Sequence, residues 1–462
     1  MSRSRNLFLS KQRKNYDAGY QPVFRSGYPV STRSRLFPMY IPALVLLVVL
    51  CTYCREQAET KISSPSGMDY LLNNKELQSF GEKLFFDTNL SSPEGQSCAA
   101  CHGPEVGWTG PDEIVNKTGG VYPGALHERY GNRKPNSSAY ASLAPLFNVF
   151  VENGKVVFSG GNFWDGRATG HLLGNPAADQ AQGPFLNPVE QNIDNAKTLV
   201  DKVCNSEYAS LFRKVGNDIW KVPDICNSNN LNLQFGIIGI AIAAFENSEK
   251  VNSFSSKYDF YLQGKVELTA IEEQGLELFK GKAKCSNCHA IEYETGSTLP
   301  LFTDFTFDNL GIPKNPQNPW YAMDTTFNKN GPKWIDPGLA EFLKEKPQYA
   351  MYAEENYGKH QVPTLRNVDK RPSPDFVKCY GHNGYFKSLE EVVHFYNTRD
   401  VLPPANEVSD PLPGVNCWPL PEVALNMNKE ELGNLGLTAE EESSIVEFMK
   451  TLSDGYVLQN TK

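Results

Sequence analysis

The chain has 462 residues, a formal net charge of -9, 40% hydrophobic residues and 21% charged residues. These values are typical of a folded globular protein with about two domains, and they exclude a disordered, collagen-like or multi-span membrane chain. The excess of acidic residues argues against a nucleic-acid partner, because nucleic-acid binding needs a clustered basic face.

The first 54 residues form an export pattern. Residues 1–35 contain eight basic residues and one acidic residue, Asp17. Residues 36–54 follow as an uncharged, mostly apolar run that would span roughly 28 Å as a helix, close to the ~30 Å bilayer core. A basic flank before an apolar run predicts a cytoplasmic N-terminus and delivery of the rest of the chain across the membrane.

The form of this segment in the mature protein is left open by its sequence. It matches an uncleaved signal anchor and a lipid-linked Cys51 about equally, with a released soluble form as the third alternative. The first two place the protein in the periplasm or on the outside of the cytoplasmic membrane, held there through the N-terminal segment.

Four segments further along the chain have the spacing of helices. Apolar residues recur three and four positions apart in residues 78–87 and again in 273–281. A strongly apolar helix is predicted over Phe235 to Asn247. The last predicted helix runs from Thr438 to Leu452, with a threonine cap and acidic residues in its first turn.

Two copies of the pattern C-x-x-C-H follow the predicted helices at residues 78–87 and 273–281. They are made by Cys98, Cys101 and His102 and by Cys285, Cys288 and His289. Two thiols at this spacing reach the two vinyl groups of one haem, while the adjacent histidine is the proximal ligand of the iron. A thioredoxin-like pair or half a zinc site does not explain a histidine after both copies, so two covalently bound haem c groups are predicted.

Four further cysteines lie outside these motifs. After export they would meet an oxidising compartment, which allows the disulfides Cys204–Cys226 and Cys379–Cys417. The alternative is four isolated buried thiols, since cysteine is among the residues most often buried.

Long stretches rich in Pro, Gly and Asn connect the predicted helices, with few alternating strand patterns. The polar residues 253–256 are interpreted as a link, with a boundary near residue 250. The sequence therefore predicts a mainly α protein of two halves, residues 65–250 and 251–455, in which haem groups replace much of a conventional core.

With these features, residues 75–455 resemble the bacterial dihaem cytochrome c peroxidases of the CcpA/MauG superfamily. Besides the two haem motifs, the matching segments are residues 82–87, 163–168, 180–184, 187–190, 363–368, 382–384 and 389–393. The resemblance implies two cytochrome c-like haem domains with long loops, the first peroxidatic and the second transferring electrons.

The resemblance also implies roles for residues near the N-terminal haem. His102 would be its proximal ligand, and Gln180 and Glu190 would line its distal side. Splitting a peroxide requires proton transfer between its oxygens, which suits Glu190 as general acid and base, while Gln180 would orient the peroxide. Trp164 would carry electrons between the two haems.

For the C-terminal haem, the resemblance implies His289 as proximal ligand and Tyr396 as the second axial ligand. Ordinary cytochrome c peroxidases have methionine there, and tyrosine is the MauG-like choice. A phenolate oxygen lowers the reduction potential relative to a thioether, which puts the usual cytochrome donor in doubt. The alternative is that Tyr396 only packs and that Met351 or another residue coordinates.

Two further family features match less well. A distal histidine caps the resting peroxidatic haem in many relatives, and His127 lies near that place; we favour an open site over capping. The family also builds a calcium site between its halves, from an asparagine in the segment matching residues 132–136 and from a Thr-x-Pro. Arg133 and Arg371 match these ligands poorly, so the resemblance allows a calcium site but does not assign its ligands. His382 matches a family position near the second haem, or is a hydrogen-bonded structural residue.

Three functions remain in view. The first is reduction of hydrogen peroxide to water with electrons from a c-type cytochrome or another redox protein, passed from the C-terminal to the N-terminal haem. The second is a MauG-like enzyme that uses peroxide and a high-valent dihaem state to oxidise aromatic side chains of a partner protein. The third, a dihaem electron carrier, would need neither Gln180 nor Glu190. We predict the first; a homodimer is compatible with it.

Overall fold

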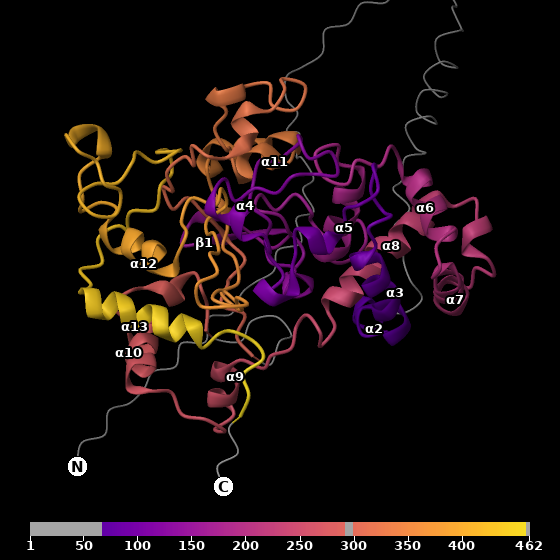
Figure 1. Cartoon of the computed structure of the whole chain (residues 1–462), viewed down its shortest axis with the longest axis horizontal. Coiled ribbons are helices and arrows are strands. Elements are labelled where there is room, and N and C mark those ends of the chain that lie inside the picture. Colours follow the sequence, from indigo (N-terminus) through magenta and orange to yellow (C-terminus); the bar gives the residue numbers. More distant parts are fainter. Residues whose placement is uncertain (1–66, 292–298, 459–462) are drawn as a thin grey trace, which may run out of the picture. The chain divides into compact units, whose positions relative to one another are not determined.

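The computed structural model describes residues 67–291 and 299–458, and this part of the chain is mainly helical (Figure 1). The predicted leader, residues 1–35, and the predicted signal or anchor, residues 36–54, lie outside the described residues. Within the described ranges, no helix is both long enough and apolar enough to cross a membrane.

Twelve α-helices and four short strands are found in the described residues. The helices are α2 (Met68–Leu72), α3 (Lys75–Phe86), α4 (Glu113–Lys117), α5 (Pro176–Leu186), α6 (Ala196–Cys204), α7 (Ala209–Trp220), α8 (Leu231–Glu246), α9 (Lys257–Leu262), α10 (Ala270–Lys280), α11 (Leu339–Glu345), α12 (Leu389–Thr398) and α13 (Ala439–Lys450). The strands form two separate antiparallel sheets: β1 (Asn148–Glu152) with β2 (Lys155–Ser159), and β3 (Phe307–Asp308) with β4 (His360–Gln361). The predicted mainly α fold is confirmed.

The first half is organised by the contact of α3 with α8, which lie side by side in Figure 1. Asn74 caps α3 by accepting a hydrogen bond from the backbone N–H of Leu77 at 3.0 Å. Gly81 of α3 lies so close to α8 that a Cβ atom there would be 1.8 Å from the carbonyl oxygen of Ala241. This glycine therefore sets how closely the two helices approach.

The second half repeats the arrangement with α10 and α13, which pack against each other and cross in Figure 1. Both helices begin with a capping box, at Thr269 and at Thr438. A Cβ atom on Gly275 of α10 would be 1.9 Å from the carbonyl oxygen of Ser444 in α13. The two halves thus share one construction: a helix whose glycine contacts a partner helix, followed by a C-x-x-C-H motif.

Replacing Gly81 by alanine is expected to lower the free energy of unfolding by about 1–3 kcal/mol, because α3 must move away from α8. Chemical denaturation of the haem-loaded protein measures this change. Gly67 is the control, because a Cβ atom there would have no neighbour within 4 Å. Equal stability of Gly81→Ala and Gly67→Ala would contradict the close contact.

Loops of the first half pack on the second half. The side chain of Asn116 donates to the carbonyl of Val377 at 3.2 Å, and Lys387 donates to the carbonyl of Asn116 at 2.7 Å. In the predicted link, Ser256 caps α9 and the N–H of Ser255 donates to Asp454. The predicted link is held by these hydrogen bonds, and loops of the two halves contact each other across it. The domain boundary near residue 250 therefore stays a prediction.

One of the two predicted disulfides is confirmed. Cys204, at the end of α6, is bonded to Cys226. The prediction Cys379–Cys417 is wrong, because both residues are free and buried. The thiol of Cys379 instead donates to the side-chain oxygen of Asn116 at 3.4 Å.

Candidate active site in a cavity shared by two haem motifs

A cavity of about 440 Å³ is lined by both C-x-x-C-H motifs. A volume in the range of ~300–1,000 Å³ is usual for ligand pockets. The same cavity is lined by each residue predicted to act with the haems, namely Trp164, Gln180, Glu190 and Tyr396. Residues from distant parts of the sequence thus meet in one place, as the resemblance implied.

The N-terminal motif lies on a short 3-10 turn, Cys98–Ala100, and its two cysteines are free. The Nδ1 atom of His102 is 3.2 Å from the carbonyl oxygen of Trp108. Burial lowers the pKa of His102 to about 4, so the ring is neutral at pH 7. A neutral imidazole whose Nδ1 donates to a carbonyl keeps its Nε2 for a metal.

The C-terminal motif repeats this geometry on the turn Cys285–Asn287. The Nδ1 atom of His289 is 2.9 Å from the carbonyl oxygen of Phe302, and burial lowers its pKa to about 4. Trp108 and Phe302, which provide the two carbonyls, both have left-handed backbone angles, with φ of 61° and 54°. Free thiol pairs, oriented neutral histidines and a shared cavity fit two haem c groups.

Gln180 and Glu190 are positioned by α5 and the turn after it. Asn175 caps α5 by accepting from the N–H of Ala177 at 2.9 Å, and the backbone oxygen of Glu190 accepts from Ala125 at 2.7 Å. Desolvation raises the pKa of the Glu190 carboxyl above its ordinary value, opposed by the nearby charge of Arg167. A carboxyl group with a raised pKa is suited to give and take protons near neutral pH.

A second carboxyl group in the cavity, Glu246, was missed from the sequence. Glu246 is 3% exposed at the end of α8, and burial raises its pKa to about 8, against a smaller opposing hydrogen bond from Ser138. It is therefore protonated at pH 7. The sequence did contain a signal: Glu246 is the single acidic residue of an otherwise apolar predicted helix, whereas a helix face exposed to solvent usually carries several charged residues.

Replacing Glu246 by glutamine is expected to stabilise the protein at pH 7. In the unfolded chain this carboxyl ionises near pH 4.5, but in the folded chain only near pH 8. As pH rises between these values, the folded state loses about 1.4 kcal/mol per unit. Glu246→Gln should thus raise the free energy of unfolding by about 3 kcal/mol at pH 7 and change it little at pH 4.

Denaturant unfolding of the haem-loaded protein at the two pH values measures this effect. Glu249→Gln, three residues further on and exposed, provides the control. An equal response to Glu246→Gln at both pH values would mean that the carboxyl is ionised in the folded protein.

Tyr396 lines the cavity from α12, on the same helix face as Leu389, Val392 and Val393. Burial raises the pKa of its hydroxyl above the ordinary value, and the cysteines of the C-terminal motif are close enough to add to this shift. The alternative ligand considered, Met351, is 78% exposed and does not line the cavity.

Trp164 is held by hydrogen bonds at both its ring and its backbone. Its indole N–H donates to the carbonyl of Lys134 at 2.8 Å, and its backbone oxygen accepts from Gln361 at 2.8 Å. The rings of His360 and His382 contact it edge-on, with centroids 6.5 and 6.4 Å away. The tryptophan is therefore fixed in one orientation within the cavity.

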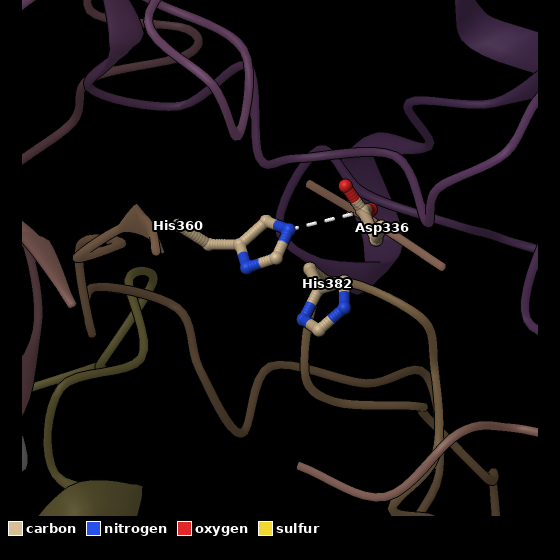
Figure 2. A group of neighbouring side chains, drawn as sticks. All are labelled: Asp336, His360 and His382. Atoms are coloured by element: carbon tan, nitrogen blue, oxygen red, sulfur yellow. Dashed lines mark ion pairs between the residues drawn. The ribbon is translucent and has the colours of Figure 1, made fainter. Parts of the chain in front are cut away.

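Figure 2 shows the two histidines, His360 and His382, together with Asp336. The two rings stack with centroids 3.6 Å apart, and Nε2 of His360 lies 3.3 Å from the Asp336 carboxylate. Burial lowers the pKa of His360 to about 4. Arg133 donates to both oxygens of Asp336 at 2.7 Å. Two parallel imidazole rings do not direct their nitrogen lone pairs at one point, which argues against a metal site. We interpret the group as two stacked histidine rings packed beside Trp164, next to an Asp336 carboxylate whose charge is balanced by Arg133.

Two other predicted positions are not brought into the site in the expected way. His127 is exposed and does not line the cavity, so capping by this residue stays a prediction. Calcium binds about six to eight oxygens, and residues 132–136 and 371 contain no carboxylate side chain to supply them. Arg133 there binds Asp336 and Asp165 instead. The residues present do not fit calcium.

Comparison with known proteins agrees with this site. A model of the family "Di-haem cytochrome c peroxidase" matches residues 75–267. The methylamine utilization protein MauG of Paracoccus denitrificans is 31% identical over 385 residues, covering 82% of this chain and 88% of the relative. The cytochrome c551 peroxidase of Nitrosomonas europaea is 28% identical over 327 residues, covering 69% of this chain and 72% of the relative.

Among solved structures, the diheme peroxidase BthA of Burkholderia thailandensis has the same fold. The TM-score is 0.65 at 24% sequence identity, with 82% of this chain and 86% of the other covered. The relationship to MauG, which spans most of both chains, decides the assignment. The chain belongs to the di-haem cytochrome c peroxidase family and is an oxidoreductase of that class.

Proposed function

We propose that this protein is an exported peroxidase that reduces hydrogen peroxide to water. Two electrons and two protons are consumed for each peroxide, and the electrons come from a c-type cytochrome or another redox protein. When bound, the two haem c groups supply redox-active iron, one for peroxide and one for the donor. The observation that carries the proposal is that Gln180 and Glu190 line the cavity that also holds His102.

In this proposal Glu190 moves the protons. Its carboxyl group takes a proton from one peroxide oxygen and returns it to the other, which leaves as water. Desolvation raises the pKa of Glu190, which favours the protonated form of its carboxyl group. Gln180 carries no charge, and its amide would hold the peroxide in place through hydrogen bonds.

Trp164 is proposed to pass electrons from the C-terminal to the N-terminal haem. Its indole N–H is bound to a carbonyl, and buried Asp336 and Asp165 lie close by, each paired with Arg133. In the same proposal residues 65–250 form the peroxidatic domain and residues 251–455 the electron-transfer domain.

Export is proposed from two observations. Residues 1–54 carry the basic and apolar pattern of an export segment. Cys204 and Cys226 form a disulfide, which is typical of proteins outside the cytoplasm. We therefore place the protein in the periplasm or on the outer side of the cytoplasmic membrane, anchored or lipid-linked by its N-terminal segment.

The proposal is tested by mixing the haem-loaded protein with hydrogen peroxide and a reduced small c-type cytochrome. We expect two cytochromes to be oxidised for each peroxide consumed. The proposal fails if neither this cytochrome nor a small-molecule one-electron donor is oxidised faster than without enzyme.

A second candidate function, oxidation of aromatic side chains in a partner protein, is favoured by one residue. Tyr396 lines the cavity where a peroxidase using cytochrome donors is expected to have methionine. Stopped-flow absorption of the ferric protein with peroxide, without reductant, separates the two. Rapid spectral change of both haems favours the second function; inertness until one haem is reduced favours the first.

A further inference from the structure

A buried ammonium group joins the two halves of the molecule beside the haem cavity. Lys378 is 4% exposed, and its Nζ atom donates to three backbone carbonyls: Val106 at 2.9 Å, Asn367 at 3.0 Å and Lys370 at 3.0 Å. Three acceptors use all three N–H bonds of an ammonium group. Val106 belongs to the first half and the other two to the second, so one cation ties both together.

Two more cationic side chains lie next to it. Lys134 donates to the hydroxyl of Thr109 at 2.9 Å and to the carbonyl of Pro135 at 3.0 Å. Burial lowers the pKa of Lys378 to about 7, and the charge of Lys134 adds to this shift, which means that the two groups are close. Arg133, the preceding residue, is paired with two carboxylates.

Arg133 and Lys134 lie in a segment in which the family resemblance implies a calcium ligand, and Lys378 binds the carbonyl of Lys370, next to Arg371 in the other. Ca²⁺ binds about six to eight oxygens, mostly carboxylates and carbonyls. Here the carbonyls are taken by Lys378, and the nearby carboxylates by Arg133. The buried Oδ1 atom of Asn136 in this segment has no hydrogen-bond partner. Ca²⁺ would also be repelled by the two neighbouring ammonium groups, so this amide oxygen does not make a calcium site.

We propose that Lys378, with Lys134 beside it, supplies the positive charge between the two halves and that this chain binds no calcium there. The cation is built into the sequence and is therefore retained when free metal is scarce. It also places positive charge on the wall of the haem cavity, which Lys134 and Lys378 both line.

The first test is metal analysis of the haem-loaded protein after exposure to calcium and removal of free ions. We expect far less than one calcium per chain, and the same melting temperature in calcium and in a calcium chelator. About one calcium per chain, with a lower melting temperature in the chelator, would overturn the proposal. This test needs no variant.

The second test replaces Lys378 by methionine, which has a similar shape and no charge. We expect a lower melting temperature, and lower haem reduction potentials measured at pH 6, because a nearby positive charge favours the reduced state. Lys387→Met is the matched control: Lys387 also donates to three carbonyls, of Asn116, Thr118 and Gly384, but does not line the cavity. It should lower the melting temperature and leave the potentials unchanged.

Equal potentials in Lys378→Met and the unmodified protein would refute the electrostatic part of the proposal. If Lys378→Met does not fold, Lys134→Met gives the same measurement, because Lys134 lines the same cavity and its loss leaves the three carbonyl bonds of Lys378 in place.

Discussion

Replacing Glu190 by glutamine is expected to slow peroxide turnover by about 10²–10⁴-fold while both haems remain attached. Glutamine keeps the size of the side chain and its hydrogen-bonding atoms but cannot take up or release a proton in this range. Glu190 lines the cavity, and its pKa is raised by removal from water, so the carboxyl group is suited to this transfer.

Steady-state kinetics with a reduced cytochrome or a small-molecule donor measures the effect, and haem absorption confirms that both groups are present. Glu128→Gln is the control, because Glu128 is exposed and does not line the cavity. Turnover of Glu190→Gln equal to that of the control would remove Glu190 from the mechanism and leave Glu246 as the carboxyl group to test next.

The haem motifs and helices could be predicted because each is local in sequence. Cys98, Cys101 and His102 are within five positions of one another. The capping residue and the apolar face of a helix likewise lie in one continuous segment of the sequence. The predicted start of the last helix at Thr438 agrees with its observed cap for this reason. Glu190, Gln180 and Trp164 were assigned their roles by family resemblance; they line one cavity, and the roles themselves stay predictions.

What the sequence did not reveal depends on partners far apart in the chain. Arg133 meets Asp336 across 203 positions, and Lys378 meets Val106 across 272. No local pattern links such residues, since a charged side chain in a loop is ordinarily solvated. The wrong pairing of Cys379 with Cys417 has the same origin, because sequence separation alone gives no information about which sulfurs lie together.

Replacing Tyr396 by methionine is expected to raise the reduction potential of the C-terminal haem by on the order of 0.1 V, if Tyr396 is its second ligand. A thioether stabilises reduced iron, whereas an anionic phenolate oxygen stabilises the oxidised form. Spectroelectrochemical titration of the haem-loaded protein gives both potentials. Tyr385→Met is the control, because Tyr385 lies near α12 in sequence but does not line the cavity.

The same variant connects the ligand to the choice of function. A higher potential makes the C-terminal haem easier to reduce, so Tyr396→Met should accept electrons from a c-type cytochrome faster than the unmodified protein does. An unchanged potential would show that Tyr396 only packs. A raised potential without faster cytochrome oxidation would mean that a c-type cytochrome is not the limiting donor, which favours oxidation of a partner protein's side chains over peroxide removal.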